Sequence, residues 1–441
     1  MSKNNENKLV PKLRFPDYSN TGNWVLSDLI DTADKKIKWS FTGGPFGSNL
    51  KAEDYTEYGI RIIQLQNIGD GEFIDDYKIY ASEKKANELL SCNIYSGEII
   101  LSKMGDPVGR ACIIPKHLER CIMASDGIRL VVDEKRFSKY FIYSLINSKQ
   151  IREAIERKST GSTRKRIGLD ELKKIKLPNP LKLEEQQKIA ACLSSLDEVI
   201  TAESQKLDVI KEHKKGLLQN LLPQAGETVP KFRFKEFVDS GEWVEKRLEN
   251  ITSKIGDGIH TTPIYDEGGN YFFVNGNNLI NGKIIVDEKT KRVTEVEYLK
   301  HKKELFDTTI LISINGTIGN VSFYQNEKVV LGKSACYINP LRDLNYVFLY
   351  YTLQSSRITQ YFAAELTGST IKNLSLKSIR EANLLIPKNP KEQEKIADTL
   401  SSVDDLINAQ NQKLEALHLH KKGLLQGLFP SVVETPWMAS L

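Results

Sequence analysis

Apolar residues recur in alternating steps of three and four along two separate stretches of the chain, residues 184–223 and 391–430. The spacing continues over about five heptads in each stretch, which is typical of a helix whose apolar seam packs against another helix. Neither stretch has an interior proline, and a proline follows the last leucine, so that proline marks the predicted helix end. The apolar seam positions are Ile189, Leu193, Leu196, Ile200, Leu207, Ile210, Leu217 and Leu221 in the first stretch, and Ile396, Leu400, Val403, Ile407, Leu414, Leu417, Leu424 and Leu428 in the second.

Polar side chains interrupt both seams at the same two points. Glu203 and Gln410 occupy one point, and Lys214 and Lys421 the other. Such residues either fix the register of paired helices or lie where the seam is open to a partner. At ~1.5 Å per residue, a helix of about 39 residues is roughly 58 Å long, so the pair is expected to act as a spacer. An ordinary helical hairpin inside one globular core is the alternative.

The bodies that precede the two seams carry shorter apolar runs. In the first body, four runs that are rich in β-branched residues predict strands: IRIIQLQNI, EIILSKM, ACIIP and IRLVVD. Residues 139–158 then predict one amphipathic helix. The second body follows the same order with NYFFVNGNNL, TILISI, NVSFY and ACYIN, then the helical run 345–366. The predicted fold is α+β: two mixed α/β bodies separated by a long antiparallel two-helix coiled-coil spacer.

The second half of the chain repeats the first. Residues 10–25 match 229–244 without a gap, and the TGST at Thr160 returns at Thr367. From there the halves stay in register to the end of both helices, with about 23 of 40 positions identical over 184–223 and 391–430. The bodies between these segments differ. The pattern indicates a pseudo-two-fold frame, and the dipeptide ET that follows both helices suggests a pseudo-cyclic order.

Composition narrows the class of protein. The content of 40% hydrophobic and 27% charged residues is that of an ordinary globular protein. No apolar run approaches the ~18 residues that span a bilayer, and the first ten residues have no signal-peptide core. The five cysteines form no CxxC pair, so neither a disulfide framework nor a zinc site is expected. We expect a cytoplasmic protein that does not associate with a membrane.

Positive charge is concentrated in one place. The whole chain has a net charge of +5, whereas residues 149–176 alone hold ten Lys or Arg against four Asp or Glu. Such a cluster favours a polyanion as partner. A solvated helix face and loop is the alternative explanation.

No catalytic constellation is recognisable. The GKS at 332–334 has Glu327 where a phosphate-binding loop needs its first glycine, and GDGIH at 256–260 does not open a helix after a strand, as a dinucleotide-binding turn does. The segments NPLK, NPLR and NPKE lack the second proline and the aromatic residue of an amino-methyltransferase loop, and the six histidines never fall at metal-ligand spacing. We expect no catalytic residue, no metal and no bound cofactor on this chain.

The segments that follow the two bodies share a specific combination of motifs. TGSTRKRIGLDELKKIKLPNPLKLEEQQKIA at 160–190 and TGSTIKNLSLKSIREANLLIPKNPKEQEKIA at 367–397 each contain a Gly-Ser-Thr turn, an L-x-x-I pair, an apolar run with proline, EQ and IA before the long helix. In this combination, and in its VPKLRF-type lead-ins, the chain resembles the specificity subunit of type I restriction-modification systems over essentially its whole length. The proline runs depart slightly from the family pattern.

The resemblance implies a role in reading double-stranded DNA. Each body would be a target recognition domain for one half of a split, asymmetric site, and the paired helices would set the gap and bind two modification (methyltransferase) subunits. Restriction (translocase-nuclease) subunits would join that core, and S-adenosylmethionine, Mg and ATP are expected only in these partner subunits. A ~58 Å spacer covers at most about 17 base pairs, so half-sites centred about one turn apart fit.

The predicted domain division follows the repeat. It consists of a lead-in at 1–24, target recognition domain 1 at 25–180, the first spacer helix at 181–223, a linker and second lead-in at 224–243, target recognition domain 2 at 244–387, the second spacer helix at 388–430 and a tail at 431–441.

Polar loops and strand ends of the bodies offer side chains that suit DNA. Arg and Lys suit guanine, and Asn and Gln suit adenine, whereas phosphates take Lys, Arg, Ser, Thr and backbone N–H groups. The candidates in the first body are Gly43, Gly44, Ser48, Lys51, Gln64, Gln66, Asn67, Lys103, Arg110, Ser162, Thr163, Arg164, Lys165 and Arg166. Those in the second body are His260, Thr261, Thr262, Asn275, Asn277, Asn278, Asn315, Thr317, Lys333, Ser369, Thr370 and Lys372. The many amides of the second body favour adenine contacts, although Asn-Gly is also ordinary turn chemistry.

Three other classes of protein remain open. A non-catalytic coiled-coil adaptor would bind only protein and would prefer no DNA sequence. A solitary nuclease would cleave DNA with a metal through carboxylates that form no recognisable motif. An RNA-binding protein would be expected to expose aromatic stacking platforms, whereas the Tyr and Phe residues here lie mostly in apolar runs. The adaptor is the main alternative.

Overall fold

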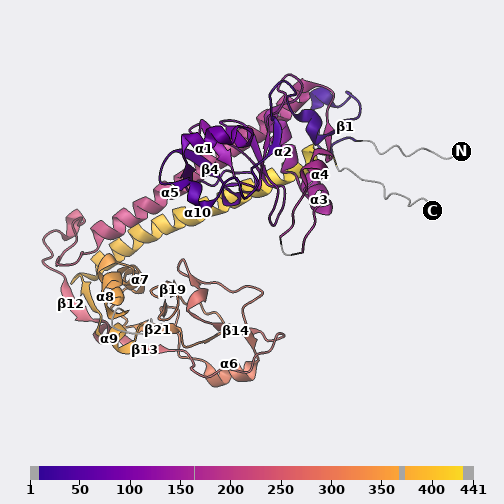
Figure 1. The fold of residues 1–441 in the computed structure, drawn as a ribbon. Coiled ribbons are helices and arrows are strands. Elements are labelled where there is room, and N and C mark those ends of the chain that lie inside the picture. Colours follow the sequence, from indigo (N-terminus) through magenta and orange to yellow (C-terminus); the bar gives the residue numbers. More distant parts are fainter. Residues whose placement is uncertain (1–8, 163, 367–372, 431–441) are drawn as a thin grey trace. The chain divides into compact units, whose positions relative to one another are not determined.

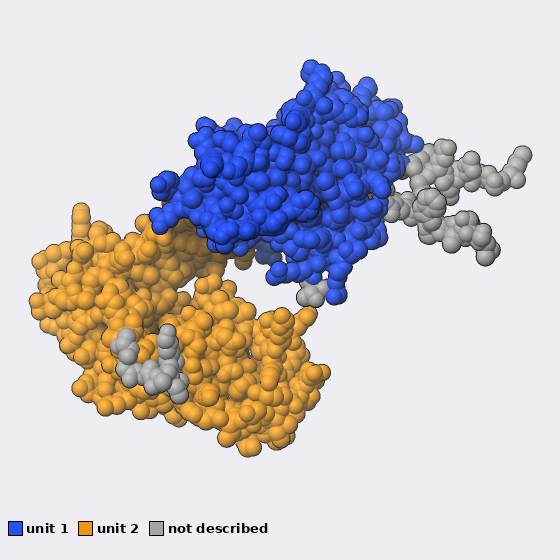
Figure 2. Space-filling model, viewed as in Figure 1, with its two compact units in different colours: residues 1–204, 413–441 blue, residues 205–412 orange. Residues whose placement is uncertain are grey.

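The computed structural model describes residues 9–162, 164–366 and 373–430 (Figure 1). The chain divides into two compact units, coloured separately in Figure 2. Unit 1 comprises Met1–Ser204 with Lys413–Leu441, and unit 2 comprises Gln205–Gln412. The division falls within both long helices, so each unit consists of one body and a part of each helix.

Two 39-residue helices confirm the helices predicted from the heptad pattern. α5 spans Leu183–Leu221 and α10 spans Pro390–Leu428. Pro390 suits the first position of α10, because its fixed φ is helical and the N–H that it lacks has no partner within the first turn. All of the apolar seam positions named above are buried or half-buried.

Ion pairs between the helices give their relative direction within each unit. In unit 1, Asp197 of α5 lies 2.6 Å from Lys421 of α10, and Glu203 of α5 lies 2.5 Å from Lys413. Residue numbers rise along one helix while they fall along the other, so the two helix parts of unit 1 run in opposite directions. In unit 2, Lys214 of α5 lies 2.7 Å from Asp404 of α10.

The body of unit 1 contains three sheets. An antiparallel sheet has the order β2-β10-β7-β8 (Phe41–Gly43, Gly127–Leu130, Ile99–Ser102 and Ala111–Ile113). A second sheet has the order β3-β5-β4-β9-β6 (Tyr55–Thr56, Ile79–Ala81, Ile60–Ile63, Arg120–Met123 and Asn93–Tyr95), with β4 and β9 parallel. β1 (Val25–Asp28) pairs with β11 (Lys176–Asn179). The four runs predicted as strands correspond to β4, β7, β8 and β10, so these predictions are confirmed.

The body of unit 2 repeats the first sheet with other residues. The order β13-β21-β18-β19 (Thr252–Asp257, Ala335–Pro340, Ile310–Ser313 and Val321–Phe323) is antiparallel throughout. A three-stranded sheet β17-β14-β20 (Arg292–Val293, Tyr271–Val274 and Val329–Leu331) and the pairs β12-β22 (Val244–Arg247 and Asn383–Ile386) and β15-β16 (Leu279–Ile280 and Lys283–Ile284) complete the unit. The predicted strands of this body correspond to β14, β18, β19 and β21.

The prediction of one helix over 139–158 is wrong, because two helices, α2 (Lys139–Ile146) and α3 (Lys149–Arg157), cover that stretch. The side chain of Asn147 accepts a hydrogen bond from the Ala111 N–H (3.2 Å) and donates one to the Ala111 carbonyl (3.0 Å). These bonds tie the break between the helices to strand β8. The run 345–366 divides likewise into α7 (Tyr346–Leu353) and α8 (Ser356–Leu366).

The remaining helices are short. They are α1 (Glu83–Glu88) and α4 (Leu169–Lys173) in unit 1, and α6 (Glu295–His301) and α9 (Leu376–Glu381) in unit 2. Among the helices that the structure describes, none combines the length and the apolar character needed to cross a bilayer.

The ends of the long helices complete the cores of the bodies. Leu428 and Phe429 lie in the core of unit 1 with Trp24 and Phe141, and the N–H of Leu13 in the lead-in donates to the Gly427 carbonyl (2.8 Å). In unit 2, the end of α5 packs in the same way, and the N–H of Phe232 donates to the Asn220 carbonyl (2.9 Å). The last turns of α10 thus pack against the first lead-in, as the predicted pseudo-cyclic order requires.

Candidate nucleic-acid interface

Several predicted loops of unit 1 meet at one end of the sheet β2-β10-β7-β8. Strand β2 ends at Gly43 and β7 ends at Ser102, and both pair with the strand β10 that begins at Gly127. The backbone hydrogen bonds of this end join the loops: Gly44 N–H to the Gly127 carbonyl (2.8 Å), Lys103 N–H to the Asp126 carbonyl (2.7 Å) and Gly105 N–H to the Lys165 carbonyl (3.0 Å). The structure therefore brings together the loops 43–51, 103–110 and 160–166.

A charged pair lies at the centre of this sheet end. An N–H of the Arg166 guanidinium donates to the Asp126 carboxylate at 3.1 Å. The side chain of Arg166 is 53% exposed and that of Asp126 is 18% exposed. Lys165 forms an ion pair with Glu156, and this hydrogen bond raises the pKa of the lysine.

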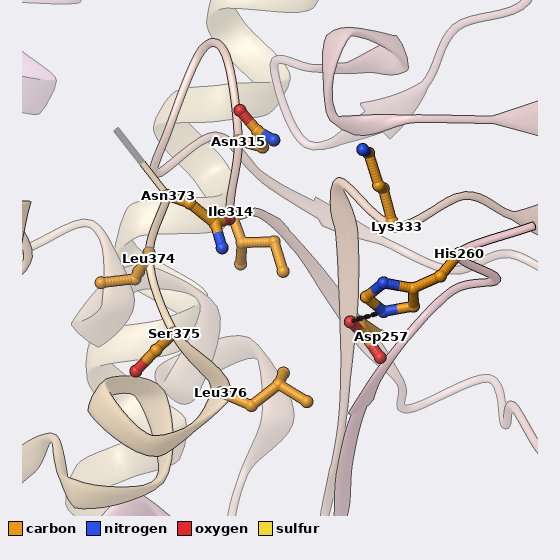
Figure 3. A pocket seen from close by; sticks show the side chains of 9 residues that line it. All are labelled: Asp257, His260, Ile314, Asn315, Lys333, Asn373, Leu374, Ser375 and Leu376. Atoms are coloured by element: carbon orange, nitrogen blue, oxygen red, sulfur yellow. Dashed lines mark hydrogen bonds and ion pairs between the residues drawn. The ribbon is translucent and has the colours of Figure 1, made fainter. Parts of the chain in front are cut away.

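Unit 2 assembles its predicted loops at the equivalent sheet end. Here β13 ends at Asp257, β18 ends at Ser313, and the loops that follow them lie next to Lys333 and to the segment 373–376. These residues surround a cavity of about 260 Å³ (Figure 3). Ile314 and Leu376 project into the cavity, and His260 and Lys333 approach it from the side opposite them.

Polar side chains surround this cavity. The imidazole of His260 lies 2.7 Å from the Asp257 carboxylate, and the backbone of Asn315 pairs with that of Asn373. Ser334 joins the loop after β14 to the same place, because its hydroxyl donates to the Asn275 side-chain oxygen (3.0 Å) and accepts the Gly276 N–H (2.9 Å).

Two predicted DNA-contact residues hold their own loops instead. Asn67 is completely buried; its side-chain oxygen accepts the Gln64 N–H (3.0 Å) and its amide donates to the carbonyls of Ile74 and Tyr77. Asn278 makes the same pattern with the Asn275 N–H (3.0 Å) and the Ile285 carbonyl (2.9 Å). Because these amides are engaged by backbone groups, neither is free to read a base in this conformation.

The other predicted residues differ in how far they are accessible. Those that are exposed are Ser48, Lys51, Gln66, Ser162, Arg164, Arg166, His260, Thr261, Thr262, Asn277, Thr317 and Lys333, and those that are half-buried are Gly43, Gly44, Gln64, Lys103, Arg110, Lys165, Asn275 and Asn315. Thr163, Ser369, Thr370 and Lys372 lie outside the described residues.

Sequence reasoning missed several residues of the two sheet ends. Asp126 carries no motif, and Asp257 lies in the GDGIH segment, which was considered only as a dinucleotide-binding turn. Both become part of the site because strands bring them there. Phe46, which is 83% exposed, lies in the predicted loop but was not selected as a polar candidate. Asn373 could have been found, because the gapless repeat places it 207 residues after Arg166.

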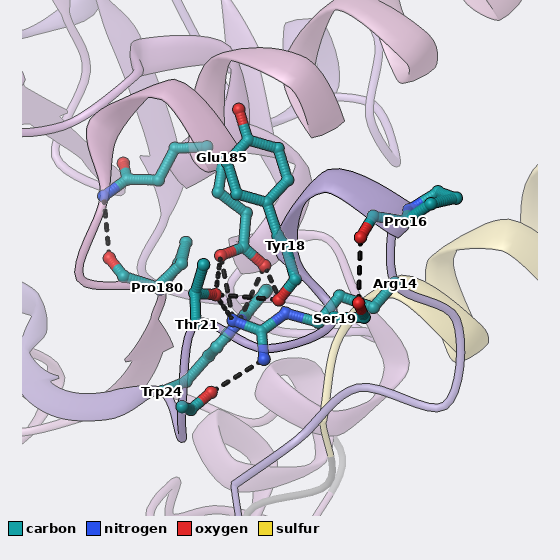
Figure 4. A network of polar contacts seen from close by, with 10 residues as sticks. Arg14, Pro16, Tyr18, Ser19, Thr21, Trp24, Pro180 and Glu185 are labelled. Atoms are coloured by element: carbon teal, nitrogen blue, oxygen red, sulfur yellow. Dashed lines mark hydrogen bonds and ion pairs between the residues drawn. The ribbon is translucent and has the colours of Figure 1, made fainter.

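A buried arginine–glutamate pair attaches the lead-in of unit 1 to the start of α5 (Figure 4). Arg14 donates to both carboxylate oxygens of Glu185, at 2.8 and 2.9 Å, and the indole N–H of Trp24 donates to one of them at 3.2 Å. Arg14 also donates to the Gly22 carbonyl (2.7 Å) and the Thr21 hydroxyl (2.6 Å). We call this group the Arg–Glu–Trp clamp.

Unit 2 contains the same clamp at the start of α10. Arg233 donates to both oxygens of Glu392 at 2.8 Å, and the indole N–H of Trp243 donates to the same carboxylate at 3.1 Å. Glu185 and Glu392 are 1% and 0% exposed. A bidentate pair at this depth fixes both position and orientation, so each lead-in is fixed to the start of the helix that follows its body.

A second repeated contact joins each body to both helices. In unit 1, the Tyr140 hydroxyl donates to Asp197 of α5, which also pairs with Lys421 of α10. In unit 2, the Tyr351 hydroxyl donates to Asp404 of α10 at 2.7 Å, and Asp404 pairs with Lys214 of α5. Burial, together with the neighbouring carboxylates, raises the pKa of both tyrosines, so they remain hydrogen-bond donors.

The described residues contain no cluster of His, Cys, Asp and Glu that could hold a metal ion. Burial raises the pKa of Cys112 and Cys121 to about 12, so these thiols are protonated at neutral pH.

Comparison with known proteins identifies the family. Residues 50–212 and 240–418 match the family described as the type I restriction modification DNA specificity domain. The chain therefore belongs to this family, with two copies of the domain. The family match and the names of the relatives favour a DNA specificity subunit over a coiled-coil adaptor. The chain therefore functions as a DNA specificity subunit of the type I restriction-modification class, which is not an enzyme by itself.

Individual relatives agree over most of the chain. It is 23% identical over 384 residues, 83% of its length and 85% of the relative's, to a Methanocaldococcus jannaschii chain that bears the name of the type I restriction enzyme MjaX specificity subunit. The MjaIX specificity subunit of the same organism is 23% identical over 75% of this chain and 76% of its own. The crystal structure of the type I restriction-modification S subunit from M. genitalium matches with a TM-score of 0.56 and 18% identity over 96% of this chain and 100% of its own, which shows the same fold.

Proposed function

We propose that unit 1 and unit 2 each read one half of an asymmetric, bipartite site in double-stranded DNA. The observation that carries the proposal is the repeated sheet end: each body gathers polar loops at the same end of the same four-stranded sheet, with different side chains in the two units. Two bodies that share one sheet but differ in their loop side chains are suited to recognise two different DNA sequences.

Charge and chemistry support a division of labour within each sheet end. Lys, Arg, Ser and Thr side chains such as Arg164, Ser162 and Lys333 suit phosphates, which position a protein on the duplex without reading its sequence. Side chains with paired donors and acceptors suit base edges. The local excess of positive charge over residues 149–176 supports DNA rather than a neutral partner.

In this proposal, α5 and α10 pair as an antiparallel coiled-coil spacer that sets the unread gap and docks two modification (methyltransferase) subunits. The near-copied helix sequences support the docking role, because two copies of one partner need equal surfaces. The two clamps and the two Tyr–Asp–Lys contacts support the spacer role, because they attach each unit to the helices in the same way. Restriction (translocase-nuclease) subunits join the complex, and S-adenosylmethionine, Mg and ATP are bound by these partners. We propose the cytoplasm, where cellular DNA is accessible, as the place of action.

The test is a binding selection. The full chain is co-expressed with a candidate modification subunit, the assembled complex is incubated with a randomised DNA pool, and the retained DNA is sequenced. We expect a split motif with an unread gap of several base pairs. Exchanging the bodies for those of a relative with another motif should exchange one half-motif for each body exchanged.

An assembled complex that retains DNA without sequence enrichment would contradict the proposal. Binding should also weaken steeply as the salt concentration rises, because protein cations replace counterions on the phosphates. A control chain with Lys116→Ala, an exposed position in the turn after β8 at the opposite end of the sheet from the loops, should return the same motif.

A further inference from the structure

Each sheet end contains one backbone-paired couple of residues at the equivalent place: Met104–Arg166 in unit 1 and Asn315–Asn373 in unit 2. In unit 1, the backbone of Arg166 pairs with that of Met104, and the next N–H, of Ile167, donates to the Lys103 carbonyl at 3.0 Å. In unit 2, the backbone of Asn373 pairs with that of Asn315, and the next N–H, of Leu374, donates to the Ile314 carbonyl at 2.9 Å. The gapless repeat aligns Arg166 with Asn373. Both bodies therefore hold this pair in one geometry and vary only its side chains.

In unit 1, the arginine of the Met104–Arg166 pair has the chemistry of a guanine reader. The guanidinium has five N–H donors, and Asp126 engages one of its terminal nitrogens while the side chain stays 53% exposed. Arginine reads guanine by donating two hydrogen bonds to O6 and N7. A carboxylate that holds one terminal nitrogen of the guanidinium reduces the number of orientations that the side chain must give up on binding, and leaves the other N–H donors available.

The pair in unit 2 has the chemistry of an adenine reader. Asparagine can accept from N6 and donate to N7 of adenine, and Asn315 and Asn373 both line the cavity of about 260 Å³. Ile314 and Leu376 project into that cavity (Figure 3), and an apolar surface suits the methyl group of the thymine that pairs with adenine.

Acidic groups beside both pairs disfavour phosphate as the ligand. Asp126 lies 3.1 Å from the Arg166 guanidinium, and Asp257 lines the cavity of unit 2. A carboxylate next to a phosphate is repulsive, whereas base edges are uncharged acceptors and donors. Lys333 and the exposed His260 at the same cavity are the groups better placed for the backbone of DNA.

We propose that this pair is the base-reading position of each body, with Arg166 selecting a G·C pair in one half-site and Asn315 with Asn373 selecting an A·T pair in the other. The inference rests on the proposed function, since it assigns a base class to each body of the two-reader frame. It predicts that the two half-motifs differ at their equivalent position, because the residues that the repeat aligns there are Arg166 and Asn373.

The experiment repeats the selection with single variants of the full chain in the assembled complex. Arg166→Lys keeps the charge but loses the two-pronged donor, and we expect it to reduce the preference for guanine at one position of one half-motif by roughly 5- to 100-fold. Asn373→Ala and Asn315→Ala should do the same to an A·T position of the other half-motif. The gap and the remaining positions should not change.

Matched controls lie outside the sheet ends. Arg136→Lys in the turn before α2 and Asn383→Ala in β22, both exposed, should return the wild-type motif. If Asn373→Ala erases a whole half-motif, Asn373→Leu keeps a similar branched shape without adding a charge and tests the loss of the amide's hydrogen bonds. Loss of preference at a single position by Asn373→Leu supports the inference.

The outcomes separate this inference from the function on which it rests. If wild type returns a split motif but the variants return the same motif, the inference is overturned while the two-reader frame stands. A uniform loss of affinity without a change of motif also overturns it, because that result identifies a phosphate contact. If wild type returns no motif, the proposed function itself fails.

Discussion

At the scale of single residues, neighbours in one loop have different tasks. Gln66 and Asn67 are adjacent polar amides in the turn after β4, yet Gln66 is exposed and Asn67 is completely buried. The Asn67 side chain forms hydrogen bonds with three backbone groups, the Gln64 N–H and the carbonyls of Ile74 and Tyr77. Buried backbone groups that lose their partners destabilise a fold. The same distinction separates the exposed Asn277 from the engaged Asn278 in unit 2.

Substitution of these neighbours should separate stability from binding. We expect Asn67→Ala to lower the free energy of unfolding by about 1–3 kcal/mol, because it removes the side-chain partners of the Gln64 N–H and the Ile74 carbonyl, whereas the Tyr77 carbonyl keeps its hydrogen bond from Arg61. Gln66→Ala should leave the free energy of unfolding within about 0.5 kcal/mol of wild type. Thermal unfolding followed by circular dichroism measures the difference. Equal melting temperatures for the two variants would contradict this assignment.

At the scale of elements, the Arg–Glu–Trp clamp shows how a lead-in is joined to the start of a long helix. Glu185 and Glu392 sit near the start of their helices, where a carboxylate also interacts favourably with the helix dipole. Each is buried under an arginine and a tryptophan from a lead-in that is remote in sequence. Because burial of one charge without the other is costly, the pair specifies a single docking of lead-in and helix.

Removal of one partner of each clamp should destabilise only the unit that contains it. We expect Glu185→Ala and Glu392→Ala each to cost about 3–5 kcal/mol, because an arginine is left buried without its partner. Hydrogen exchange resolved by peptide reads out the loss of protection: in unit 1 for Glu185→Ala and in unit 2 for Glu392→Ala. The exposed neighbours Glu184→Ala and Glu394→Ala are the controls. Protection that falls equally in both units, or not at all, would refute the assignment.

At the scale of the whole molecule, the two units are built alike from parts of the chain that the repeat makes equivalent. Unit 1 combines the first body with the beginning of α5 and the end of α10, and unit 2 combines the second body with the complementary helix parts. The division after Ser204 and after Gln412 marks the places where each helix passes from one unit into the other.

Insertion at these two places should lengthen the gap of the proposed DNA site. One heptad added after Ser204 and another after Gln412 keeps every seam residue in phase and adds about 10 Å of helix, or about 3 base pairs. Sequencing of the retained DNA should return unchanged half-motifs with the longer gap. Insertion into one helix alone should abolish the split motif, because the two helices then differ in length. An unchanged gap after the double insertion would rule out the spacer role.

Much of this protein follows from its sequence alone. The heptad spacing predicted both long helices, because apolar residues that alternate in steps of three and four lie along one face only when the chain is helical. The gapless repeat predicted two similar bodies, and the paired motifs predicted the family. Strand runs such as 99–102 were predictable because β-branched residues suit an extended chain.

Only the tertiary structure decided how the pieces combine into sites. The break at Asn147, the burial of Asn67, the clamp on Glu185 and the Asp126 carboxylate beside Arg166 depend on partners that are distant along the chain. Such contacts follow from strand pairing and packing, which local propensity does not encode. The sequence by itself determined the helices, the repeat and the family, whereas the fold decided which polar residues face a ligand, because that depends on what each side chain meets in three dimensions.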